Sequence, residues 1–277
     1  MKEESHKMID RRLTDDRRNP ELEGSAMALA QAMENGDIRL LYQPQYALDG
    51  TIVGAEALAR WERSTDAAAN DGEQSMAGEA LFALAEATGQ AQQLGDHLRA
   101  IAFNTAACWP EGLRLSFNAT PQDLGRDDFV ASLTELLEQT GCDPERLTLE
   151  ITEQAVMRDL ANPAARLKRI RALGIGVALD DFGAGFCNFG YLKKLPVDCL
   201  KLDRSMIAGV GEDTRDLEIL RAIVAMARAL NLAVVAEGVE SKAQRDLVIA
   251  EGCTAWQGFY GAGPLAEADF LARAIAG

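Results

Sequence analysis

The sequence predicts an α/β fold in which strands alternate with helices around a closed barrel. Apolar runs of strand length alternate with longer segments of helical periodicity, and this alternation indicates parallel β-α-β units. The strand count is near eight over 277 residues, which favours a closed barrel over an open doubly wound sheet. The sequence shows no glycine fingerprint of a dinucleotide-binding fold.

The N-terminal part predicts one helix, two strands and a loop. Residues 26–35 have helical periodicity, and the strand-like residues 38–43 follow a Gly-Asp break. A second strand is expected over residues 51–58, beyond the turn Leu48-Asp49-Gly50. Residues 64–76 are small, polar and acidic, so they predict a loop.

The rest of the chain predicts regular alternation. Strands are expected at residues 113–117, 147–151, 175–179, 197–202 and 232–236. Helices are expected between them at residues 129–139, 163–173, 215–230 and 241–250. We therefore expect residues 1–25 to form a charged leader or linker and residues 26–277 to form one barrel domain.

Composition restricts the class of protein. The formal charge of −15 opposes binding to polymeric nucleic acid or to anionic membranes. No apolar run approaches the ~20 residues of a spanning helix, so membrane insertion is not expected. The five cysteines lack the spacing of a zinc site, and the N-terminus lacks the apolar core of a signal peptide. These features predict a soluble cytoplasmic protein with free thiols.

The polar residues that end the apolar runs predict the site. In such a barrel the catalytic face lies at the C-terminal ends of the strands. The residues at these positions are mostly carboxylates: Glu56, Asn118, Glu150 with Glu153, Asp180 with Asp181, Lys201 and Glu237. Any single one is explained as well by a helix cap or a solvated side chain. Together they would repel one another unless a cation offset their charge. Oxygen ligands favour Mg²⁺ or Mn²⁺, and the presence of only two histidines disfavours zinc or non-haem iron.

The adjacent pair Asp180-Asp181 ends a buried strand and predicts a site for two ions. Neighbouring strand residues point to opposite sides, but we expect Gly183 and Gly185 to relax the backbone so that both carboxylates face the rim. Asp180 would then bridge two cations while Asp181 holds one. Two such cations clamp the attacking water and the leaving oxygen of a phosphodiester. The alternative is an aspartate cap on the next helix.

Seven short motifs carry a more specific resemblance. They are Tyr42-Gln43-Pro44, Glu56-Ala57-Leu58 with Arg60-Trp61, Leu149-Glu150-Ile151-Thr152-Glu153, Asp180-Asp181-Phe182-Gly183, Leu195-Pro196-Val197-Asp198 leading to Lys201, Ala236-Glu237-Gly238-Val239-Glu240, and Gln257-Gly258-Phe259. In this order, over about residues 26–265, the chain resembles the EAL-domain family of cyclic di-GMP phosphodiesterases. The resemblance implies a TIM-like (β/α)₈ barrel with one antiparallel strand, which hydrolyses cyclic di-GMP to linear pGpG with Mg²⁺ or Mn²⁺, two ions per site.

The resemblance also implies a role for each site residue. Glu56, Asn118, Glu150 and Asp180 match the ligands of the first metal, and Asp180 with Asp181 match those of the second. Lys201 matches the residue that orients or deprotonates the attacking water, and its alternative is a surface lysine with a buried stem. Glu237 and Gln257 match the water and metal shell. Gln43 and Arg60 match contacts to the nucleotide, and Glu153 matches the glutamate that steadies the loop after Asp181.

That loop departs from the family pattern. The family commonly has Asp-Phe-Gly-Thr-Gly-Tyr-Ser-Ser, whereas here Asp181 begins the sequence DFGAGFCN. Phe186, Cys187 and Phe189 make the segment more apolar, and the resemblance associates it with subunit pairing. We therefore expect a homodimer whose activity depends on the loop and on Glu153. The alternative is that both phenylalanine rings fill the helix layer of the same barrel. The charged leader is compatible with a linker in a longer parent chain that carries an upstream sensory or GGDEF domain, although no such domain is present in these residues.

Three functions are compatible with the resemblance: an active phosphodiesterase, a catalytically silent cyclic di-GMP receptor, and an interaction scaffold that uses only the barrel surface. Silent members of the family usually lose a metal ligand or the lysine. Neither is lost here, so the enzyme is favoured. Without the resemblance, the residues alone predict a two-metal phosphoester hydrolase on a barrel.

Overall fold

The computed structural model describes residues 20–62, 75–153, 155, 161–184 and 189–276. The chain divides into two compact units, Met1–Arg39 with Ala59–His97 and Leu40–Leu58 with Leu98–Gly277. Strands β1 (Ile38–Tyr46) and β2 (Ile52–Glu62) and helix α4 (Ala91–Cys108) run through both units. Among the described residues, no helix is both long enough and apolar enough to cross a bilayer.

The first unit is built from helices α2 (Pro20–Asn35) and α3 (Gly78–Ala87) and the short strand β3 (Ser75–Ala77). Strand β3 pairs in antiparallel fashion with the end of β2. Helices α2 and α3 contact each other, and Leu29, Leu81 and Ala85 are fully buried. Helix α2 begins at Pro20, earlier than the predicted residue 26, because its charged first turns carry little apolar periodicity.

The second unit contains a closed eight-stranded barrel. Its further strands are β4 (Arg114–Ala119), β5 (Leu147–Thr152), β6 (Gly176–Phe182), β7 (Cys199–Leu202), β8 (Ala233–Ala236) and β9 (Ala255–Trp256). The strands follow the order β1-β9-β8-β7-β6-β5-β4-β2, and pairing between β1 and β2 closes the ring. The neighbours from β2 to β9 are parallel, whereas β1 runs antiparallel to β9. The predicted barrel with one antiparallel strand is confirmed.

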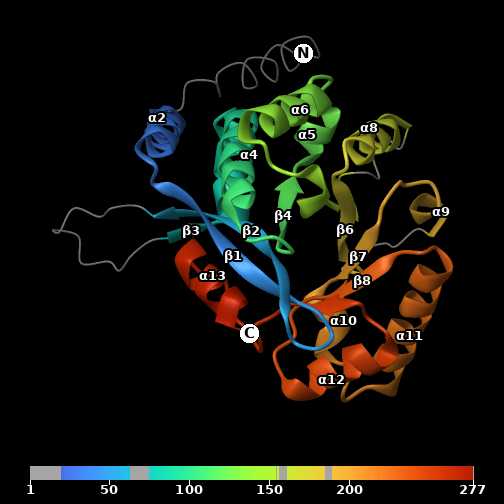
Figure 1. Ribbon diagram of the computed structural model, residues 1–277. Helices are drawn as coiled ribbons and strands as arrows, with labels where there is room; N and C mark the ends of the chain where they lie inside the picture. The colour runs from blue at the N-terminus through green and yellow to red at the C-terminus, as the bar shows by residue number, and fades with distance from the viewer. Residues whose placement is uncertain (1–19, 63–74, 154, 156–160, 185–188, 277) are drawn as a thin grey trace, which may run out of the picture. The chain divides into compact units, whose positions relative to one another are not determined.

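Helices of the second unit cover the outside of the strands (Figure 1). They are α5 (Pro121–Gly125), α6 (Phe129–Thr140), α8 (Ala161–Ala172), α9 (Phe189–Leu192), α10 (Arg204–Ala208), α11 (Thr214–Ala229), α12 (Lys242–Glu251) and α13 (Glu267–Ala276). Helix α8 contacts β6, α11 contacts β8, and α12 contacts β9. Local chemistry sets their ends: Ser241 and Gln244 form a capping box at the start of α12, and Gly252 adopts a left-handed conformation at its end.

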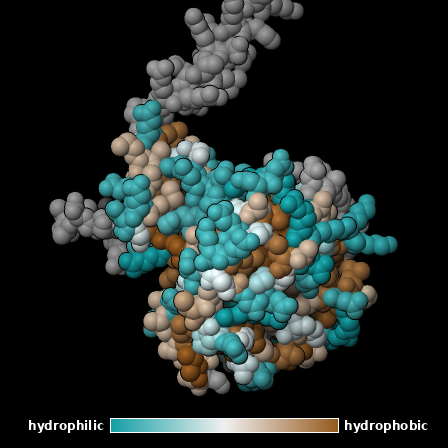
Figure 2. Space-filling model, turned by 45° about the horizontal axis from the view of Figure 1, so that its top comes forward, coloured by the Kyte–Doolittle hydropathy of each residue, from teal (hydrophilic) through white to brown (hydrophobic). Residues whose placement is uncertain are grey.

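Alternation along each strand separates the helix-facing residues from the barrel interior. On β7, Leu200 and Leu202 are fully buried, and Lys201 between them points the other way, into the barrel. The interior at this level is therefore polar while its outer face is apolar. The molecular face drawn in Figure 2 carries many hydrophilic residues with hydrophobic ones between them, as expected for a chain of net charge −15.

Candidate active site

The strand registers bring the predicted carboxylates to one level of the barrel interior. Asn118 on β4 stands opposite Glu150 on β5. The β6 residue that pairs with Glu150 lies two residues before Asp180. In the same way, the β4 residue that pairs with Glu56 lies two residues before Asn118. Because residues two apart in a strand face the same side, all four side chains face the interior. The steps of two residues follow from the tilt of the strands in a closed barrel.

An irregularity in β6 explains how both adjacent aspartates reach the site. Strand β6 carries two residues, Asp180 and Asp181, where β7 carries only Lys201. Asp181 adopts a left-handed backbone with φ of 55°, and Gly183 follows with φ of 100°. The predicted explanation through relaxed glycines is thus only partly right, because the bulge and the backbone of Asp181 itself turn its carboxylate. Gly185 lies outside the described residues.

Lys201 is the centre of the cluster. Its Nζ lies 2.6 Å from Glu150 Oε2, 2.7 Å from Glu237 Oε1, 3.2 Å from Glu56 Oε2 and 3.2 Å from Asp180 Oδ1. The lysine side chain is 1% exposed, and that of Glu150 is fully buried. The alternative of a surface lysine is therefore wrong. The ammonium group offsets carboxylates that come from four different strands or strand ends.

The protonation of Lys201 and Glu150 follows from this crowding. Burial acts to lower the pKa of Lys201, but the four surrounding carboxylates raise it well above its ordinary value. Burial, and then the charge of Glu56, raise the pKa of Glu150 well above its usual range. Without a divalent cation, this crowding therefore favours the charged form of Lys201 and the protonated form of Glu150.

The remaining carboxylates respond differently. Burial is the main reason that the pKa of Glu237 rises to about 8, and the charges of Asp180 and Glu56 add to this effect. Burial acts to raise the pKa of Glu56 as well, but Lys201 and hydrogen bonds from neighbouring amides lower it. The pKa of Asp181 is raised by burial and by Asp180. Glu237 is the group whose protonation is closest to changing near neutral pH.

Two amide side chains support the carboxylates. Gln257 Nε2 donates to Glu56 Oε2 at 2.8 Å and to Glu237 Oε1 at 3.0 Å. Gln45 Nε2 donates to Gln257 Oε1 at 3.2 Å, which turns the Gln257 amino group towards the carboxylates. Gln45 is absent from the predicted site, although it lies two residues from Gln43 on the same face of β1 and this spacing is the signal for it.

The predicted substrate contacts lie in different places. Gln43 lines a cavity of about 220 Å³ together with Glu56, Glu237 and Gln257, and Phe259 at its edge is 66% exposed. Arg60 lies on the part of β2 that belongs to the first unit, and its Nη1 donates to Ala59 O at 2.8 Å.

The structure describes only part of the segment that follows Asp181. Glu153 follows directly after β5 and is half-buried. Phe186 and Cys187 lie outside the described residues, as does the side chain of Phe189. The proposed link between this loop, Glu153 and subunit pairing therefore stays a prediction.

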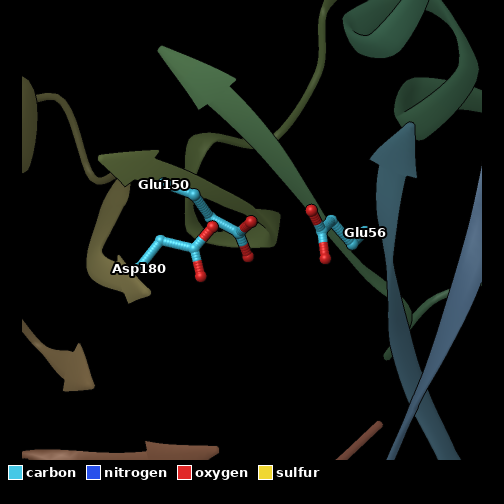
Figure 3. Close-up of side chains that lie close together, drawn as sticks. All are labelled: Glu56, Glu150 and Asp180. Atoms are coloured by element: carbon cyan, nitrogen blue, oxygen red, sulfur yellow. The ribbon is translucent and has the colours of Figure 1, made fainter. Parts of the chain in front are cut away.

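The donor set fits hard divalent cations. Oxygens of Glu56, Glu150 and Asp180 lie within 4.8 Å of one another, and so do oxygens of Asp180, Asp181 and Glu237. Figure 3 shows the carboxylates of Glu150 and Asp180 side by side, with Glu56 facing them from β2. Among the described residues, Glu150 Oε1 is buried without a hydrogen-bond partner, as expected for an oxygen that serves as a cation ligand. The ligands are all oxygens, which suits Mg²⁺ or Mn²⁺.

The chain is similar to a known protein family and to proteins of named activity. The EAL domain family matches residues 26–264. The bifunctional diguanylate cyclase/cyclic di-GMP phosphodiesterase MucR of Pseudomonas aeruginosa is 35% identical over 249 residues, which cover 88% of this chain and 35% of MucR. The cyclic di-GMP phosphodiesterase NbdA of the same organism is 38% identical over 243 residues, or 86% of this chain and 30% of NbdA. The chain spans about a third of the length of these relatives.

Solved structures show the same fold. The c-di-GMP complex of the PaMucR phosphodiesterase superposes with a TM-score of 0.81 at 33% identity, covering 90% of this chain and all of the other. The EAL domain of Mycobacterium smegmatis DcpA gives a TM-score of 0.72 at 29% identity, covering 87% of this chain and 97% of that domain. With the family matched along most of its length, the chain belongs to the EAL domain family.

Proposed function

We propose that the chain hydrolyses cyclic di-GMP to linear pGpG and depends on Mg²⁺ or Mn²⁺. The observation that carries this proposal is that Asp180 belongs to both groups of converging oxygens. A carboxylate shared in this way is the feature that a two-ion phosphodiesterase requires. The similarity to relatives named as cyclic di-GMP phosphodiesterases, and to one solved with c-di-GMP, supports the choice of substrate.

The residues divide naturally between two ions. Glu56, Glu150 and Asp180, with the amide oxygen of Asn118, would hold one cation, and Asp180 with Asp181 would hold the other. When bound, these cations would lower the pKa of a water molecule and offset the negative charge that develops on the phosphate. In a chain of net charge −15, the same cations would allow an anionic substrate to approach.

Lys201 and Glu237 are placed to handle the attacking water. Lys201 Nζ lies within 3.2 Å of oxygens of four carboxylates at the centre of the cluster, so we assign it the role of orienting or deprotonating the attacking water. Glu237 Oε1 lies 2.7 Å from Lys201 Nζ, so we assign this carboxylate to the shell of the same water molecule. Gln257 donates to Glu237 at 3.0 Å and fixes its direction. In this proposal Gln43 and Arg60 contact the nucleotide.

The test is an assay of the purified chain with cyclic di-GMP and either Mg²⁺ or Mn²⁺, with chromatography that separates pGpG from GMP. We expect pGpG from the parent chain, loss of product in Asp180→Asn, and normal activity in Asp246→Asn. Asp246 is a suitable control because its side chain is 46% exposed and pairs only with residues of its own helix, α12. Binding of cyclic di-GMP without hydrolysis by the parent would identify a receptor instead. An active Asp180→Asn enzyme would contradict the two-ion assignment.

We also propose that the active chain is a homodimer in the cytoplasm. The support for the compartment is that the four described cysteines, Cys108, Cys142, Cys199 and Cys253, are free thiols. The support for pairing is the apolar sequence that follows Asp181. Light scattering of the parent and of Glu153→Ala, alongside their kinetics, tests the assembly: a monomeric parent would remove pairing from the proposal and leave the site assignment intact.

A further inference from the structure

A buried ion pair lies outside the carboxylate cluster. Arg99 Nη2 on α4 is 2.9 Å from Asp123 Oδ1 on α5, and the two side chains are only 2% and 3% exposed. Burying two charges costs desolvation energy that their attraction recovers only when the geometry is good and the remaining atoms are also paired.

The second oxygen of Asp123 holds the turn that follows β4. Asp123 Oδ2 accepts hydrogen bonds from Thr120 N at 3.0 Å and from Thr120 Oγ1 at 2.8 Å. In return, Asp123 N donates to Thr120 Oγ1 at 3.1 Å, which completes a capping box at the start of α5. The Asp123 carboxylate thus contacts the end of β4 through Oδ2 and Arg99 through Oδ1.

The arginine is itself fixed in place. Its guanidinium carbon lies 5.0 Å from the centroid of the Phe129 ring, which is fully buried. Arg126 Nη1 lies 3.8 Å from the same Asp123 oxygen that Arg99 contacts. Asp123 therefore has little freedom to move, and the position of Thr120 follows from it.

Thr120 is two residues beyond Asn118, the amide that belongs to the proposed metal site. Asn118 Nδ2 donates to Glu56 Oε1 at 3.2 Å, so its amide oxygen is the atom left to face a cation. We propose that Arg99 and Asp123 are positioning residues that hold the end of β4 so that Asn118 meets the cation. This inference rests on the proposed function, because it assumes that the cluster binds a divalent cation.

The substitution Asp123→Asn probes the pair with little change of shape. Each Asp123 oxygen accepts a hydrogen bond: Oδ1 accepts from Arg99 Nη2 and Oδ2 accepts from Thr120 N. An asparagine offers only one oxygen, so its amino group must face a donor on one side. The side chain at position 123 then loses its hydrogen bond either with Arg99 or with Thr120 N, while the barrel strands keep their pairing.

The experiment is a double-mutant cycle read out by Mn²⁺ affinity in isothermal titration calorimetry, with no turnover involved. The four proteins are the parent chain, Asp123→Asn, Asn118→Ala and the double variant. Asp246→Asn is the control, since its side chain is 46% exposed and its partners, Lys242 and Arg245, lie on α12. Loss of an outer positioning contact typically weakens metal binding by about 10–100-fold. We expect a loss of that size in Asp123→Asn, none in Asp246→Asn, and little further loss when Asp123→Asn is added to Asn118→Ala.

These measurements distinguish failure of the positioning role of Asp123 from failure of the proposed metal site. If the parent binds no Mn²⁺, or if Asn118→Ala binds as tightly as the parent, the proposed metal site is wrong and this inference falls with it. If those two tests hold but Asp123→Asn binds like the parent, or loses equal affinity in both backgrounds, only the inference is overturned. Should Asp123→Asn unfold, Thr120→Val takes its place in the same cycle, because it cuts the side-chain link without leaving a buried charge unpaired.

Discussion

Lys201 Nζ lies 2.6 Å from Glu150 Oε2, and both side chains are buried away from solvent. In the absence of metal, this lysine is the cation that allows Glu56, Asp180 and Glu237 to approach the same point. The geometry links stability to metal binding, since a divalent cation would take over part of the same charge compensation.

Lys201→Met should therefore destabilise the metal-free protein strongly and the metal-loaded protein less. Removing one partner of a buried charge cluster typically costs about 3–5 kcal/mol, because the remaining charges are left uncompensated. We expect the midpoint of thermal unfolding in EDTA to fall well below that of the parent, and added Mn²⁺ to recover part of the difference. Lys242→Met is the matched control, because that lysine is 69% exposed in its pair with Asp246. Equal losses with and without Mn²⁺ would argue against shared charge compensation.

The stability of the metal-free protein should fall as the pH rises from about 5 to 8. Glu237 has an ordinary pKa of 4.5 and a pKa of about 8 in the folded chain. Between these pKa values the folded state keeps a proton that the unfolded state has released. The contribution of this proton to stability is therefore fully present below pH 4.5 and is lost as the pH rises to about 8. One such proton changes the free energy of unfolding by about 1.4 kcal/mol per pH unit. Glu150 and Asp181 act in the same direction, since their pKa values are also raised.

Urea unfolding in EDTA at several pH values checks this slope. Glu237→Gln keeps the shape and removes the titration, so its slope across the same window should be shallower than that of the parent. A parent that is as stable at pH 8 as at pH 5 would show that these carboxylates are not held protonated in the folded state.

The sequence predicts the polar cluster well because each member interrupts or ends an apolar run. Glu150 and Lys201 are conspicuous among buried leucines, and parallel strands must bring such positions to one end of a barrel. The bulge at Asp180 and Asp181 is not predictable in the same way. It depends on the backbone angle of a single residue and on a register shift, and neither leaves a periodic signal.

Asp181→Asn should separate the two ions. Asparagine tolerates the left-handed φ of 55° at this position, so the fold should keep its stability. The charge lost belongs to only one of the two oxygen groups. We expect the number of Mn²⁺ ions bound per chain to fall from two to one, and kcat to fall by at least about a hundredfold, because ion charge supplies several kcal/mol in such reactions. Two bound ions in this variant would disprove the assignment of Asp181.

Gln45→Leu should lower activity without removing any proposed ligand. Gln45 orients Gln257 through a hydrogen bond of 3.2 Å, and loss of one such bond costs about 1 kcal/mol. We expect kcat/KM to fall by about fivefold with unchanged Mn²⁺ affinity. Gln139→Leu provides a control, because that side chain bonds only to an exposed glutamate on its own helix. Parent-like kinetics in Gln45→Leu would mean that Gln257 needs no outside support.

Elements that the periodicity misses are short or weakly patterned. Strand β9 has only two residues, Ala255 and Trp256, which is too short for an alternating signal, yet the barrel closes through it. On helix α4 the buried residues Leu94, Leu98 and Ala102 follow helical spacing, but Arg99 is recognised as buried only once Asp123 is placed beside it. Contacts between distant segments supply this information, and local sequence does not.

The central claim is that Asp180 is shared by two metal ions. Anomalous X-ray scattering from crystals of the chain grown with Mn²⁺ tests it most directly, because manganese is located by its own signal and independently of activity. We predict two anomalous peaks in the barrel, both in contact with Asp180, one also touching Glu56 and Glu150 and the other also touching Asp181. A single peak, or two peaks of which only one contacts Asp180, would contradict the account.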